Sequence, residues 1–140
     1  MGLYLCVFRD DATDEEVEGV EVGSYADFHR FRETVAGRLE PDGWGTRFPV
    51  LMGHDDSDGT WSPEEAARLE SELLTIADAF AALPPVAFDA DWQLDLARRD
   101  GIEPGSLLES FIDVDGEPLL ERLIELARTS SDTREPIWFQ

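Results

Sequence analysis

The sequence has no lysine and no asparagine, so its 11 basic residues are all arginine, set against 32 acidic residues. The formal net charge is −21. GC-rich codon usage or adaptation to high salt would each explain the missing lysine. A field of this sign repels nucleic acid and anionic lipid, and it speeds association with cationic proteins. The composition therefore argues against nucleic acid or a membrane as a partner and favours a basic protein.

Side chains suited to redox, nucleophilic or metal chemistry are also scarce. The one cysteine, Cys6, lies in the apolar run LYLCVF, and no internal disulfide can form. The two histidines, His29 and His54, are too few for a zinc site built on nitrogen and sulfur ligands. Glycine and serine fingerprints of nucleotide-binding and hydrolase sites are absent as well. We therefore expect a protein that is not an enzyme and needs no cofactor.

Long hydrophobic runs are missing too. No stretch of about 20 apolar residues occurs. The N-terminal segment MGLYLCVFRDD has neither the apolar length nor the basic leader of a signal peptide. We expect a cytoplasmic protein. At 140 residues, without a Pro- or Ser-rich divide, the chain predicts a single domain over residues 1–140.

Apolar patterns predict the strands. The run from Leu3 to Phe8 is apolar throughout, as expected for a central strand, and VEGVEVGS alternates valine with Glu and Gly as a half-exposed strand does. The two together predict a β-hairpin. The segment RFPVLMG is expected to form a strand, in which Pro49 indicates an edge position or the strand's start. The residues from Ile137 to Phe139 are expected to form a final strand.

Three longer amphipathic helices are predicted from apolar residues at steps of three and four. Ser24 with Asp27, and Ser62 with Glu65, have the spacing of capping boxes at the first two helix starts. The third helix follows Pro118. These elements predict an α+β fold, in which a mixed β-sheet is covered by about three longer amphipathic helices.

Two short helices are expected between the second and third long ones. The first starts at Asp91 and stops before Gly101, a residue suited to the left-handed conformation at a helix end. The second covers Pro104 to Phe111. The DVDG stretch from Asp113 is expected to be a turn.

The stretch HDDSDGTWSPEE, from His54 to Glu65, has the spacing of a calcium-binding loop. With its glycine at the sixth position, the ligands would be His54, Asp56, Asp58, Thr60 and Glu65. The first ligand should be a carboxylate, and imidazole nitrogen binds hard cations poorly. The segment before the loop also predicts a strand, whereas an EF-hand needs a helix there.

The same stretch also reads as a type I turn followed by a capped helix start. Proline directly after the capping serine and two glutamates in the first turn both favour that reading. We therefore expect a rigid turn and no metal site, and we keep a calcium-binding regulatory module as the alternative function.

Two tryptophans, Trp44 and Trp61, lie in predicted loops among Gly and Asp residues. An aromatic anchor ringed by acids is typical of a surface that selects a basic protein. The other two, Trp92 and Trp138, are expected in the core. The predicted partner-binding residues are Trp44, Asp55, Asp56, Asp58 and Trp61.

Segments spread over nearly the whole chain resemble one known family. The segments are MGLYLCVF, GVEVGSYADFHRFR, DGTWSPEE, FIDVDGEPLLERL and PIWFQ. Together they resemble the immunity protein 70 family of bacterial polymorphic toxin systems. The resemblance implies a small cytoplasmic protein that binds and neutralises a cognate toxin domain without chemistry of its own, and it transfers no catalytic residue.

Many toxin domains are basic nucleases, toward which a strongly negative inhibitor is steered by charge. The expected partner is therefore a cognate toxin domain, basic in character. A mimic of nucleic-acid charge directed at a basic host enzyme is a further alternative.

Overall fold

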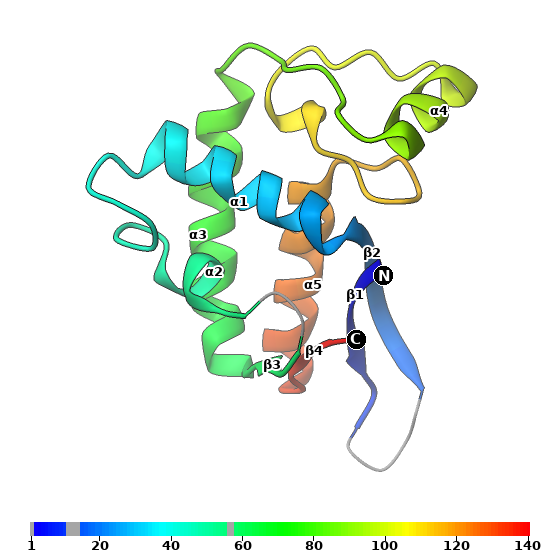
Figure 1. The fold of residues 1–140 in the computed structure, drawn as a ribbon. Coiled ribbons are helices and arrows are strands. Elements are labelled where there is room, and N and C mark those ends of the chain that lie inside the picture. Colours follow the sequence, from blue (N-terminus) through cyan, green and yellow to red (C-terminus); the bar gives the residue numbers. More distant parts are fainter. Residues whose placement is uncertain (1, 11–14, 56–57) are drawn as a thin grey trace.

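The computed structural model of the protein describes residues 2–10, 15–55 and 58–140. Its four strands form one sheet in the order β2-β1-β4-β3 (Figure 1). The strand bounds are β1 Gly2–Phe8, β2 Glu16–Ser24, β3 Thr60–Trp61 and β4 Ile137–Phe139. Every pairing between these strands is antiparallel. The predicted α+β class is confirmed, but the sheet is antiparallel and not mixed, because β4 returns beside β1 in the opposite direction.

Strand β1 is central, as predicted, with β2 on one side and β4 on the other. It forms the expected hairpin with β2. The side chains of Leu3, Leu5 and Val7 are completely buried, and they meet Val20 and Val22 of β2 in the same core. Alternation along a strand places these five residues on one face of the sheet.

Five α-helices accompany the sheet in the described part of the chain. Their bounds are α1 Tyr25–Leu39, α2 Pro49–Gly53, α3 Pro63–Ala81, α4 Asp91–Asp100 and α5 Leu119–Thr133. In Figure 1, α3 and α5 run side by side, α1 crosses in front of them, and α4 lies apart. None of the described helices is long and apolar enough to span a membrane.

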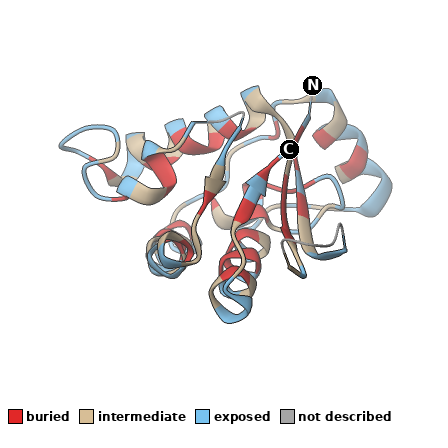
Figure 2. Cartoon of the chain, turned by 90° about the horizontal axis from the view of Figure 1, so that it is seen from below, coloured by how far each residue is buried: buried red, intermediate tan, exposed pale blue. Residues whose placement is uncertain are grey.

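The main core lies between the sheet and the three long helices (Figure 2). Aromatic rings fill its centre: Phe31 of α1 lies 5.4 Å from Phe111 and 6.5 Å from Phe80 of α3, between ring centroids. A smaller cluster of Phe88, Leu96 and Ile112 lies beneath α4. The half-buried Trp92 packs against this smaller cluster.

Both predicted capping boxes are present. Ser24 accepts a hydrogen bond from the backbone N–H of Asp27, and Ser62 accepts one from that of Glu65. The carboxylates of Asp27 and Glu65 accept from the N–H groups of their capping serines in return. These local bonds fix where α1 and α3 begin.

The expected edge strand at RFPVLMG is wrong, because this segment is the short helix α2. Its N-terminal N–H groups, those of Val50 and Leu51, donate to the carboxylate of Glu72 on α3, at 3.1 and 2.9 Å. Because the residue that caps α2 lies on α3, the sequence around α2 contains no capping signal that would predict a helix. The expected helix over residues 104–111 is also shorter, since only Leu108–Ser110 form a 3-10 turn.

Replacing Ser62 with alanine removes the side-chain half of a capping box, and we expect it to destabilise the protein by about 1 kcal/mol. Urea denaturation measures the change. Ser71→Ala, at an exposed position inside the same helix, is the matched control and should be close to neutral. Equal effects of the two substitutions would show that the cap does not matter.

Candidate functional site

A buried carboxylate shapes the loop between α1 and α2. Glu40 is only 4% exposed. Its side chain accepts hydrogen bonds from the backbone N–H groups of Gly45, Arg47 and Phe48, each at 3.0 Å. One side chain therefore fixes the path of the loop around Trp44.

Trp44 lies on this loop and is 45% exposed. Its indole Nε1 donates to the carbonyl oxygen of Met52 at 2.7 Å, and its ring stacks on that of His29 at 5.7 Å between centroids. His29 itself is exposed. Contacts on two sides hold the Trp44 ring in place while much of it remains open to solvent.

Arg32 connects this loop to the next one. Its guanidinium, on the buried side of α1, donates to the carbonyl oxygens of Leu51 and His54, at 3.2 and 2.7 Å. It also lies over the rings of Phe28 and Trp44, at 4.7 and 5.8 Å from their centroids. Trp44 and the start of the His54 loop are therefore held by one cation.

The acidic loop after α2 is anchored by His54. Its ring stacks on Phe139 of β4 at 4.1 Å, with Nε2 2.9 Å from the carbonyl oxygen of Thr60 and Nδ1 2.6 Å from that of Asp55. Asp55 and Asp58 are exposed. The predicted contact residue Asp56 lies outside the described residues.

The candidate calcium ligands have other partners. Glu65 accepts from the backbone N–H of Ser62, and both ring nitrogens of His54 face backbone carbonyls. Within the described residues, which omit Asp56, no three His, Cys, Asp or Glu side chains are grouped so as to hold a metal ion.

Trp61 and Trp138 occupy each other's expected environments. Trp61 is 1% exposed and donates from Nε1 to the carbonyl oxygen of Val50 at 3.1 Å. The prediction that it projects toward a partner is therefore wrong. Trp138, expected in the core, is 39% exposed.

Strand pairing explains this exchange. Trp61 pairs with the buried Ile137, whereas Thr60 pairs with Trp138. Because alternate residues of a strand face opposite sides of a sheet, Trp61 points into the core and Trp138 points away from it. The pattern IWF, with apolar residues on both sides of the tryptophan, conceals this alternation in the sequence.

Trp138 belongs to the sheet face opposite the core, which we call the open face. Its residues are Tyr4, Cys6, Gly19, Glu21, Thr60 and Trp138. Cys6 pairs with Gly19 on one side and with Trp138 on the other. The hydroxyl of Tyr4 crosses above Gly19 and donates to Glu16 at 2.5 Å.

Burial affects the two ionisable side chains in the middle of the open face. Burial raises the pKa of the Tyr4 hydroxyl, and the hydrogen bond to Glu16 raises it further. Burial, assisted by the negative charge of Glu16, raises the pKa of the Cys6 thiol to about 11. Cys6 is thus a neutral side chain beneath the surface of this face.

Comparison with protein families matches residues 3–139 to immunity protein 70. The chain belongs to the immunity protein 70 family. Its role is therefore that of an immunity protein directed against a toxin. Searches of curated proteins and of solved structures returned no match.

Two residues that shape the candidate surface of this immunity protein were not identified from the sequence. Glu40 and Arg32 look like ordinary surface charges of an acidic, arginine-containing chain, yet both are buried. Arg32 does follow Phe28 and Phe31 on the apolar side of α1. That position is the one sequence signal that could have identified it.

Glu40→Gln should destabilise the immunity protein by about 1 to 3 kcal/mol, because an amide NH₂ would face buried backbone donors. Chemical denaturation measures the loss. Glu33→Gln is the control, since Glu33 lies on α1, the helix that ends just before Glu40, and has a 61% exposed side chain. A Glu40→Gln protein as stable as the control would contradict the role of this carboxylate.

The Cys6 thiol should react slowly in the folded protein. With a pKa of about 11, roughly one thiol in a thousand is ionised at pH 8, against about a quarter of ordinary free thiols. Iodoacetamide labelling followed by mass spectrometry should be at least about a hundredfold slower than in urea, and it should accelerate as pH rises. Equal rates with and without urea would refute the burial of Cys6.

Proposed function

We propose that this immunity protein neutralises its cognate toxin domain by forming a stoichiometric complex in the cytoplasm, without catalysing any reaction. The family supports a toxin as the partner. The net charge of −21 supports a basic toxin domain, such as a nuclease whose cleft binds phosphate. Steering between opposite charges accelerates encounter, which suits an inhibitor that must bind before the toxin acts.

We further propose that Trp44, Asp55 and Asp58 contact the toxin, together with Asp56 between them. This proposal rests on one observation: the Trp44 ring is exposed to solvent and is also held in place by its neighbours. Its ring is already held by Met52 and His29, so binding immobilises little that is free. Preordered aromatic rings are the anchors from which interfaces gain much of their affinity. Trp61 is not included among the proposed contact residues because it is buried.

The connected loops support a joint role for the ring and the acids. Arg32 bonds the carbonyl oxygen of His54, the residue before Asp55, and lies over the Trp44 ring. Trp44 and His54, where the acidic loop begins, therefore share one support, which favours a single basic surface that contacts both the ring and the acids. The aromatic ring supplies affinity, and the acids supply rate and selectivity.

Trp44→Ala should raise the dissociation constant for the cognate toxin domain by about tenfold or more. Asp58→Arg should mainly slow association, and the effect should shrink as salt rises. Biolayer interferometry at several salt concentrations measures both changes.

Leu74→Ala and Asp78→Arg are matched controls, because both residues are exposed and lie one helical turn apart on α3. Leu74→Ala should leave the binding constants unchanged, and Asp78→Arg should slow association less than Asp58→Arg does, because it changes the net charge equally but lies outside the proposed contact. Wild-type affinity in both Trp44→Ala and Asp58→Arg would remove this surface from the proposed interface. A wild-type protein that neither binds nor neutralises the toxin would overturn the proposed function itself.

A further inference from the structure

Exposed apolar side chains adjoin the open face from several elements. Trp138 of β4 lies on it, and the exposed Val17 belongs to β2. The exposed Val114 lies beside β2, because its backbone N–H donates to the carbonyl oxygen of Glu21 at 2.9 Å. Exposed apolar groups that gather around one surface are typical of a binding site.

A cavity of about 390 Å³ continues the open face toward α4. Gly2 and Gly23 of the hairpin, Val114 and Trp92 are among the residues that line it. Gly23 has a positive φ of 119°, and a side chain there would place its Cβ only 2.9 Å from Trp92. Glycine at this position lets the Trp92 ring lie directly against the strand.

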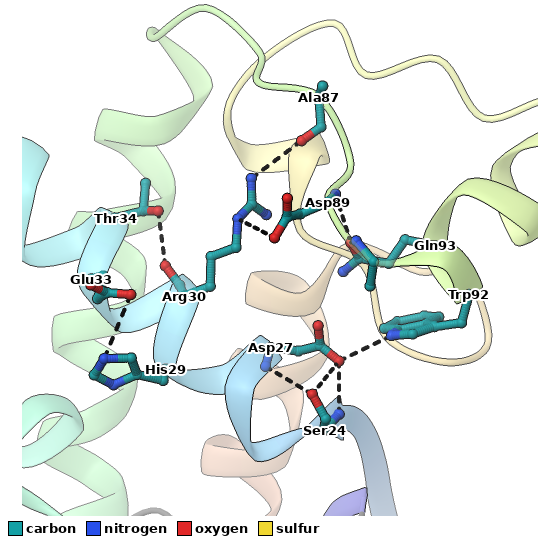
Figure 3. Close-up of polar contacts among 11 residues, drawn as sticks. Ser24, Asp27, His29, Arg30, Glu33, Thr34, Ala87, Asp89, Trp92 and Gln93 are labelled. Carbon is teal, nitrogen blue, oxygen red and sulfur yellow. Dashed lines mark hydrogen bonds and ion pairs between the residues drawn. The ribbon is translucent and has the colours of Figure 1, made fainter.

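The wall of this cavity is preformed. Trp92 donates from Nε1 to the carboxylate of Asp27 at 3.0 Å, and the same oxygen accepts from Ser24 (Figure 3). Arg30 holds the segment before α4 through the carbonyl oxygen of Ala87 and the carboxylate of Asp89. The segment that positions Trp92 is therefore tied to α1 at separate points.

Charge on this surface is negative. Glu16 and Glu21 flank the Tyr4 ring, and Glu21 and Asp27 line the cavity, which has no basic residue among those lining it. Arg9, just past β1, is paired with Glu15 at 3.1 Å. A second copy of this chain would bring the same carboxylates together. The surface is complementary to a cationic partner instead.

Two backbone carbonyl oxygens of β2, those of Gly19 and Glu21, already accept hydrogen bonds from residues outside the sheet. Besides the bond from Val114 to Glu21, the carbonyl oxygen of Gly19 accepts from Arg122 at 2.7 Å. Arg122 is itself paired with the buried Asp113 and with Glu18. A partner therefore meets the side chains of the open face and not a free strand edge.

We infer that the open face, with Trp138 and Tyr4 as its aromatic centre and the cavity beside Trp92 as its extension, binds an apolar segment of the toxin that bears Lys or Arg side chains. This inference rests on the proposed function and adds a binding surface to it. The apolar part covers Trp138 and enters the cavity, while the cationic groups meet Glu16 and Glu21. Thr60 pairs with Trp138 on the open face and lies two residues after Asp58 of the acidic loop. One surface of the toxin can therefore contact the open face and the acidic loop together.

Trp138→Ala and Glu21→Arg test the inference in binding measurements with the purified cognate toxin domain. Each substitution should raise the dissociation constant about tenfold or more, and Glu21→Arg should also slow association. Trp138→Phe should retain most of the affinity because a ring remains. The α3 variants Leu74→Ala and Asp78→Arg serve again as controls, and circular dichroism checks that each variant is folded.

The outcomes separate this inference from the proposed function. If the wild type does not bind the toxin, the proposed function fails. If the wild type binds and both Trp138→Ala and Glu21→Arg match it, only the open-face inference is lost. Should Trp138→Ala fail to fold, wild-type binding by Glu21→Arg overturns the inference. A wild-type dimer that Glu21→Arg strengthens or Trp138→Ala abolishes would replace the toxin with a second copy as the occupant.

Discussion

The three residues of β4 are the constraint on which most of this structure depends. They pair with β1 on one side and β3 on the other, and so they join the beginning, the middle and the end of the chain. Ile137 and Phe139 point into the core, where Phe139 also supports the stacked ring of His54. The same alternation turns Trp138 outward. Core packing, the fixed start of the acidic loop and the aromatic centre of the open face therefore follow from one strand register.

Acidic residues have two separate physical roles in this protein. A few buried or half-buried carboxylates, above all Glu40 and Glu72, accept backbone N–H bonds and determine the shape of the loop and of α2. Burial raises the pKa of Glu72, which shows that this role has an electrostatic cost. The exposed carboxylates, several of which pair with arginine side chains, supply the long-range field. A protein built this way can have an acidic surface for a basic partner and still hold its loops rigidly.

The sequence was sufficient for features whose signals are local. Capping boxes at Ser24 and Ser62, the continuous apolar strand and the helical periodicity predicted the hairpin and the long helices correctly. Features determined by distant residues were missed. Helix α2 depends on Glu72, 22 positions after Val50, and the loop around Trp44 depends on the burial of Glu40. The environments of Trp61 and Trp138 were exchanged because only the pairing register reveals which face each one takes.

We infer that the toxin covers the open face of the sheet. Hydroxyl-radical footprinting of the free protein and of its toxin complex tests it most directly, because mass spectrometry reads the oxidation of each tryptophan and leucine separately. Because the toxin would cover Trp138, we expect its oxidation to fall severalfold in the complex, whereas oxidation of Leu74 on α3 should stay the same. Equal oxidation of Trp138 in the free and bound protein would contradict it.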